Sequence, residues 1–266
     1  MSLGVVIKGP EGVVLAADSR VTLQAGKKGK PPFIVNFDNT SKLMSFSEPH
    51  DYVGAVTYGL AVIGSRTASS FLPEFEQDVL SNKTKRLSVQ KYAEELSNFF
   101  MERWEKVMPR DYKGPGMTFI IGGYDEKDAY GKVFLFSIPE QPELQPRNPD
   151  DFGMTWGGQL QVASRIIHGY DPNIMPILQN KFSLSQEQMN SLVIEFRKNL
   201  EYPIPYEVLP LQDCIDLAIF LIRSTISAQH LAIGVRGVGG LIEVAVVTRT
   251  NPLNYIQKKK IRGESK

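Results

Sequence analysis

The chain has 266 residues, of which 42% are hydrophobic and 22% charged, a composition typical of a soluble globular protein. Its formal charge of +1 gives no global signal for nucleic acid or an acidic substrate, and no apolar run reaches membrane-spanning length. The single cysteine, Cys214, excludes an internal disulfide, and the absence of a secretory signal makes the cytoplasm the expected location.

The first expected elements are two short strands joined by a tight turn. Residues 3–8 form an apolar run of strand length, and residues 12–18 form a second run that ends in Asp18. Gly and Pro between the runs predict a reversal of the chain. If Met1 is removed, the first strand begins at the free amine and hydroxyl of Ser2, within reach of Asp18. This is the arrangement of an N-terminal nucleophile.

The rest of the chain alternates strands and helices in blocks. Further strands are expected at 41–47, 52–58, 117–124, 132–138, 153–157 and 241–247. Helices are expected at 62–80, 89–108, 160–168, 186–200 and 211–226. This order predicts an α+β protein in which two mixed sheets lie between helical layers. We expect a single domain over residues 1–256, followed by a basic tail over 257–266 that frays.

Residues 12–20, which read GVVLAADSR, carry the most specific motif of the chain. Together with the strand before them, they resemble the opening of a proteasome β-type subunit, whose mature chain starts with a nucleophilic residue. Without a gap in the comparison, Ser2 falls on the position of the nucleophile and Asp18 on that of a structural aspartate. The match is specific over about the first quarter of the chain and depends on the order of elements after that.

Two later strands extend this resemblance. Residues 39–44 are similar to the strand that bears the active-site lysine of the family, here Lys42. Residues 52–59 are similar to the strand that ends in the oxyanion-hole glycine, here Gly59. The predicted catalytic set is therefore Ser2, Asp18, Lys42 and Gly59.

The resemblance implies both a fold and an activity. The implied fold is the four-layer αββα sandwich of N-terminal-nucleophile (Ntn) hydrolases. The implied activity is hydrolysis of peptide or unfolded-protein substrates inside a homo-oligomeric ring, and the family also admits a partner ATPase that unfolds substrates. No cofactor, nucleic-acid partner or membrane partner is expected. No metal is expected either, because His50, His168 and His230 have no spaced ligand partners.

The chemistry follows from the groups themselves. An N-terminal serine supplies its own base, since an α-amine titrates at about 7.7–8.0. Lys42 is expected to lower the pKa of this amine by like-charge repulsion, while Asp18 holds the lysine charged and in place. The backbone N–H of Gly59 is expected to stabilise the developing oxyanion. The expected product is an acyl-enzyme that water hydrolyses.

Two positions depart from the family pattern and keep other functions open. Where the family has a supporting serine, this chain offers Thr155 or Gln159, and residues 232–240 contain no acid where the family has an aspartate and a serine. One alternative is a non-catalytic ring subunit. Another is an N-terminal-nucleophile amidase or transferase, for which the extra segment 170–210 serves as a lid or an oligomer contact.

Overall fold

The computed structural model describes residues 2–25, 33–82 and 85–263. Met1, the middle of the basic 22–38 loop and the end of the basic tail therefore lie outside the described residues. The described helices include none whose length and hydropathy would let it span a membrane.

The first sheet contains the predicted N-terminal hairpin at its centre. Its five strands follow the order β12-β1-β2-β13-β14. Their bounds are β1 Leu3–Lys8, β2 Val13–Ala17, β12 Gly153–Gly158, β13 Glu243–Val247 and β14 Asn254–Gln257. Strands β1 and β2 are buried along their whole length, because neighbouring layers cover both of their faces.

The second sheet faces the first. It has the order β11-β10-β9-β6-β5, with the bounds β5 Leu43–Ser45, β6 Val53–Gly59, β9 Met117–Gly123, β10 Lys132–Ile138 and β11 Gln141–Arg147. Every strand pair described in both sheets is antiparallel, so the expectation of mixed sheets was wrong. Tight turns produce antiparallel neighbours directly, and here the helical connections also return the chain to an antiparallel position.

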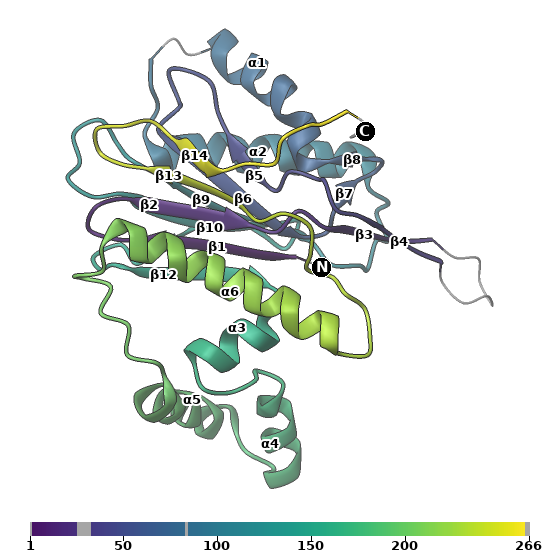
Figure 1. Ribbon diagram of the computed structural model, residues 1–266. Helices are drawn as coiled ribbons and strands as arrows, with labels where there is room; N and C mark the ends of the chain where they lie inside the picture. The colour runs from purple at the N-terminus through teal and green to yellow at the C-terminus, as the bar shows by residue number, and fades with distance from the viewer. Residues whose placement is uncertain (1, 26–32, 83–84, 264–266) are drawn as a thin grey trace.

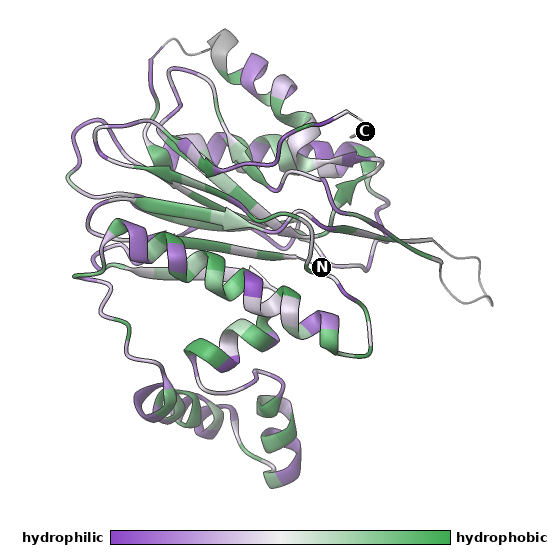
Figure 2. Cartoon of the chain, in the orientation of Figure 1, coloured by the Kyte–Doolittle hydropathy of each residue, from purple (hydrophilic) through white to green (hydrophobic). Residues whose placement is uncertain are grey.

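Apolar side chains hold the two sheets together. Val6 and Leu15 of the first sheet belong to the same buried cluster as Val56 and Ile120 of the second. The sheets approach closely, because a Cβ atom added to Gly4 would lie 2.5 Å from Cγ1 of Val56. Figure 2 shows these central strands as mainly hydrophobic.

Helices cover the outer face of each sheet (Figure 1). They are α1 Leu72–Asn82 and α2 Val89–Val107 on the second sheet, and α3 Leu160–Ile167 and α6 Leu211–Leu231 on the first. Phe100 of α2 packs on Phe119, whose ring stacks on Phe136 at a centroid distance of 4.9 Å. The α+β class expected from the sequence is therefore confirmed.

Several elements differ from the sequence prediction. The helix expected at 62–80 begins only with α1, and short elements precede it: β7 Val62–Ile63, β8 Arg66–Thr67 and the 3-10 helix η1 Ala68–Phe71. Pro73 in the first turn of α1 is a signal for this later start. The 22–38 loop contains a hairpin of β3 Val21–Ala25 and β4 Phe33–Phe37.

The segment between α3 and α6 contains two helices rather than one extra helix. They are α4 Ile174–Phe182 and α5 Gln186–Leu200. A capping box begins α5, with Ser185 and Gln188 exchanging hydrogen bonds. In Figure 1 this pair of helices lies beyond α3, away from α1 and α2.

The start of the basic tail contacts the first sheet. Gln257 ends β14 and donates from Nε2 to the carbonyl of Ile242 at 2.6 Å. Nζ of Lys258 lies 4.0 Å from the ring centroid of Tyr255. Nζ of Lys259 lies 3.9 Å from Oε1 of Glu243. The domain bounds 1–256 and 257–266 stay a prediction.

Replacing a side chain between the sheets tests this core. Leu15 is fully buried there, so Leu15→Ala should lower the free energy of unfolding by about 2–5 kcal/mol, through lost burial and the cavity that remains. Leu231 is 91% exposed, and Leu231→Ala should change stability by less than about 0.5 kcal/mol. Urea unfolding with an unchanged m-value measures both effects. Equal losses for the two variants would contradict the described packing.

Candidate active site

The pairing of β1 with β2 places Asp18 beside the start of the chain. Gly4 pairs with Ala17, so Asp18 lies opposite Leu3. The backbone N–H of Leu3 donates to Oδ1 of Asp18 at 3.0 Å, and the N–H of Asp18 points to the carbonyl of Leu3 at 3.4 Å. The residue that follows Ser2 is therefore held directly by the Asp18 carboxylate.

The carboxylate of Asp18 is fully buried and accepts four hydrogen bonds. Oδ1 accepts from Leu3 and, at 2.7 Å, from Nζ of Lys42. Oδ2 accepts from the backbone N–H groups of Arg20, at 3.1 Å, and Gly239, at 3.0 Å. One side chain therefore joins its own segment to three others, at Leu3, Lys42 and Gly239.

Lys42 lies immediately before β5 and reaches Asp18 from the second sheet. Its carbonyl accepts a hydrogen bond from the N–H of Thr57 at 3.0 Å, which fixes its backbone against β6. Only 5% of its side chain is exposed. Burial lowers the pKa of Lys42, and the nearby charge of Asp18 and their hydrogen bond only partly oppose this effect. The ammonium is therefore easier to deprotonate than that of an ordinary lysine.

Ser2 is also buried, with 5% exposure. Its carbonyl accepts from the N–H of Gln159 at 2.7 Å. At the neighbouring Gly158, φ is +106°, and a Cβ atom there would lie 1.9 Å from the carbonyl oxygen of Ser2. A side chain at position 158 is therefore incompatible with this placement of Ser2.

Ser2 and Lys42 line one small hollow, together with Thr57, Tyr58 and Leu60. The hollow has room for little more than a water molecule. Its other lining residues come from β3, the segment before Lys42 and the connection between β6 and α1. They are Val21, Thr40, Ser41, Ala61, Thr67 and Ala68. The structure thus brings three of the four predicted residues, Ser2, Asp18 and Lys42, into one buried group.

Gly59 lies at the edge of this group. It ends β6 with φ +90°, and the residues on either side of it, Tyr58 and Leu60, line the hollow. A Cβ atom at Gly59 would lie 2.5 Å from the carbonyl oxygen of Gly116, so the backbone there requires glycine.

The sequence departs from the family pattern at Thr155 or Gln159 and in residues 232–240, and these lie at different places around Ser2 and Asp18. Gln159 contacts Ser2 through its backbone N–H. Thr155 pairs with Val6 in the middle of β1, four residues along from Ser2. The acid-free segment 232–240 contributes the backbone N–H of Gly239 to Asp18. Because this donor is a backbone N–H, the amino-acid sequence does not reveal that it binds Asp18.

The sequence analysis missed a second buried carboxylate. Glu243 is 1% exposed and lies on β13. It pairs with Ala17, the residue that precedes Asp18. Its Oε2 accepts from Oγ of Ser41, the neighbour of Lys42, at 2.8 Å. A lone glutamate inside the apolar run 241–247 is the signal that could have identified it. The described residues contain no group of three His, Cys, Asp or Glu side chains placed to hold a metal ion.

Comparison with known proteins supports the fold. No protein-family model and no curated protein matches the sequence. Among solved structures, the chain is similar to the Anbu (Gly-1) mutant from Hyphomicrobium sp. strain MC1, with a TM-score of 0.56 and 14% sequence identity. The match covers 97% of this chain and 86% of that chain. At this identity the likeness shows the fold alone, which is of the proteasome type.

The Asp18–Lys42 ion pair can be tested by a double-mutant cycle. Asp18→Asn leaves the buried ammonium of Lys42 without a counter-charge, so it should cost about 3–5 kcal/mol of unfolding free energy. Lys42→Met in the same chain should recover part of that loss, because the unpaired charge is gone. Chemical denaturation of the parent, both single variants and the double variant gives the coupling energy.

An exposed ion pair provides the control for this cycle. Arg165 of α3 binds Asp171 at 2.6 Å with 63% of its side chain exposed. Arg165→Gln should change stability by less than about 1 kcal/mol. A loss in Asp18→Asn no larger than in this control would contradict a buried, coupled pair.

Proposed function

We propose that this protein is a proteasome-like peptidase that uses Ser2 as an N-terminal nucleophile after removal of Met1. One observation carries the proposal: a single atom, Oδ1 of Asp18, accepts hydrogen bonds from both the N–H of Leu3 and Nζ of Lys42. This shared acceptor tethers the ammonium of Lys42 near the residue that bears the proposed nucleophile. The resemblance of residues 12–20 to the opening of proteasome β-type subunits points to the same assignment.

In the proposed reaction, the α-amine of Ser2 accepts the proton of the Ser2 hydroxyl. Oγ attacks the carbonyl carbon of the substrate amide, and the N–H of Gly59 donates to the oxyanion. The C–N bond then breaks, and the leaving amine takes the proton held by the α-amine. A water molecule, deprotonated by the same amine, hydrolyses the resulting ester and releases the acid.

Lys42 acts on this reaction through its charge. While protonated, it lowers the pKa of the neighbouring α-amine by like-charge repulsion, which keeps the amine available as a base. Asp18 holds Lys42 in place, and burial lowers the pKa of Lys42 itself. Loss of either partner is therefore expected to impair the first step.

The same proposal includes the layered fold, the domain bounds, the substrates, the assembly and the cellular location. Two facing sheets with helices on their outer faces support the four-layer αββα sandwich of Ntn hydrolases. We assign residues 1–256 to one domain with a basic tail over 257–266. The substrates are peptides or unfolded proteins, the assembly is a homo-oligomeric ring that an ATPase could supply, and the location is the cytoplasm.

A non-catalytic ring subunit is the second candidate. The observation that favours it is the small size of the hollow beside Ser2, which in this conformation has no room for a peptide. Catalysis therefore requires the segments that line the hollow to move when substrate binds. A further alternative is an Ntn amidase or transferase, for which the segment 170–210 with α4 and α5 would serve as a lid or an oligomer contact.

Labelling with an epoxyketone or serine-reactive probe tests the catalytic assignment. We expect the parent to be labelled on Ser2 and the variants Ser2→Ala and Lys42→Ala to be unlabelled, as read by intact mass and peptide mapping. Ser47→Ala and Lys106→Ala, at exposed positions, are the matched controls and should label like the parent. Equal labelling of all five proteins would refute the assignment.

The state of the N-terminus separates the two candidates. Natively expressed protein should begin at Ser2 if the peptidase proposal holds, because the catalytic amine does not exist while Met1 is attached. N-terminal sequencing together with intact mass measures this directly. Retention of Met1 in the assembled protein would favour the non-catalytic subunit.

A further inference from the structure

A second, larger cavity lies between the free edges of the two sheets. It is bounded by β11 and β12, the edge strands of the second and first sheets, and has a volume of about 540 Å³. Helix α3 and the segment with α4 and α5 form the rest of its wall. We call this cavity the edge pocket. Tyr58 lines both the edge pocket and the hollow beside Ser2, so the two cavities adjoin the same residue.

The charged lining of the edge pocket is basic. Arg147 enters from β11 and Arg197 from α5, and none of the described residues that line the pocket is Asp or Glu. Within the described residues, neither arginine has a carboxylate within ion-pair distance. Arg147 instead donates from Nη2 to the neutral amide oxygen of Gln145 at 3.0 Å. Two acids near the lining have basic partners of their own: Oε2 of Glu201 lies 3.7 Å from Nδ1 of His168, and Asp171 pairs with Arg165 at 2.6 Å.

Three N–H donors of residues that line the pocket are buried. They are Nε2 of Gln145, Nε of Arg147 and Nε1 of Trp156, each without a hydrogen-bond partner in the described part of the chain. Burial of such a donor without an acceptor costs roughly 1–3 kcal/mol. These atoms are shielded from water, so side chains must rotate before a ligand oxygen can reach them. The free-energy cost of leaving the donors without acceptors favours that rotation.

One wall of the edge pocket is aromatic. The ring centroids of Trp156 and His168 are 5.0 Å apart with planes inclined by 39°, and those of His168 and Tyr170 are 6.0 Å apart with planes inclined by 28°. Each of these rings provides an apolar face that the planar or apolar body of a ligand can contact. Burial and the neighbouring charge of Arg197 keep the pKa of His168 below its usual value, although Glu201 opposes them.

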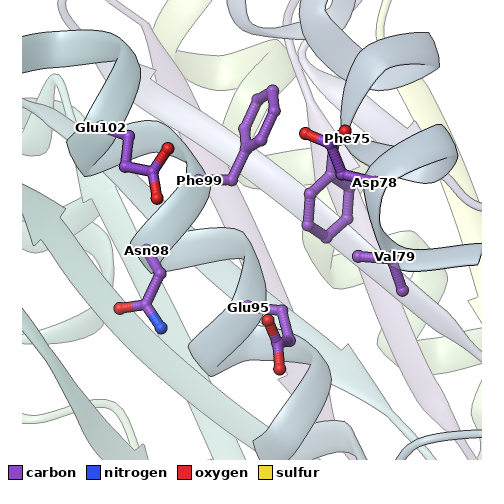
Figure 3. A pocket seen from close by; sticks show the side chains of 7 residues that line it. All are labelled: Phe75, Asp78, Val79, Glu95, Asn98, Phe99 and Glu102. Carbon is purple, nitrogen blue, oxygen red and sulfur yellow. The ribbon is translucent and has the colours of Figure 1, made fainter. Parts of the chain in front are cut away.

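A hollow between α1 and α2 shows the contrast with the edge pocket. Its acidic side chains, Asp78, Glu95 and Glu102, are drawn in Figure 3. Each has a basic partner within 4 Å: Arg103, Lys91 and Lys106, respectively. Charges in that hollow are compensated within the protein, whereas the arginines of the edge pocket have no carboxylate partner in the part of the chain that the structure describes.

We propose that the edge pocket binds a small molecule that carries a carboxylate or phosphate group on a planar or apolar body. Arg147 and Arg197 bind the anionic group, and the row formed by Trp156, His168 and Tyr170 contacts the body. Guanidinium groups suit both anions because their N–H groups match pairs of oxygens. This site is separate from Ser2 and does not depend on the proposed peptidase activity.

Calorimetric titration of the full-length protein with three probes tests the site. Benzoate carries a carboxylate, phenyl phosphate carries a phosphate, and benzamide is the neutral control of similar shape. We expect benzoate or phenyl phosphate to bind at up to millimolar concentration, and benzamide to bind about tenfold more weakly or not at all. A preference between the two anions identifies which group the pocket selects.

Variants connect the binding to the proposed residues. Arg147→Gln and Arg197→Gln should each weaken anion binding about tenfold. Arg223→Gln, an exposed arginine of α6 outside the pocket, should bind like the parent. Circular dichroism and the melting temperature confirm that each variant is folded. Absence of anion binding, equal affinity for benzamide, or parent-like binding by both pocket variants would overturn the proposal.

Discussion

The buried ion pair between Asp18 and Lys42 connects the two sheets of this protein. Asp18 follows β2 of the first sheet, and Lys42 precedes β5 of the second. Most other contacts between the sheets are apolar and non-directional, so they hold the layers together without fixing one exact position. The four N–H donors around Asp18 have defined directions, and they fix the start of β1 relative to Lys42. The position of Ser2 depends on this arrangement.

A buried pair of this kind is a costly way to join two sheets. Its two charges lose their hydration, and apolar residues of similar volume often stabilise a protein as well or better. The burial of Glu243 beside Ser41 adds a second carboxylate at the same end of the sheets. Polar groups with perturbed pKa values concentrate at functional sites, and the lowered pKa of Lys42 agrees with such a role. This end of the sheets is accordingly where we assign the chemistry.

The accuracy of the sequence analysis varied with the type of element. The apolar runs of β1, β2, β6, β9 and β10 are buried in the sheets, and their composition made them recognisable. The edge strand β11 was not predicted because its sequence, QPELQPR, is polar and contains two prolines, which disfavour a strand in the middle of a sheet. Helix α4 was missed because Pro176 interrupts its pattern, although proline is acceptable in a first turn.

The sequence by itself determined the buried central strands, the N-terminal hairpin and the identity of Ser2, Asp18 and Lys42 as a candidate set. These depend on local periodicity and on a contiguous motif, both of which can be read along the chain. Only the tertiary structure decided that Gly239 donates to Asp18, that Glu243 is buried next to Ser41, and that Arg147 and Arg197 share a cavity. The members of each of these groups come from segments distant in the chain, and packing of the sheets and helices alone brings them together.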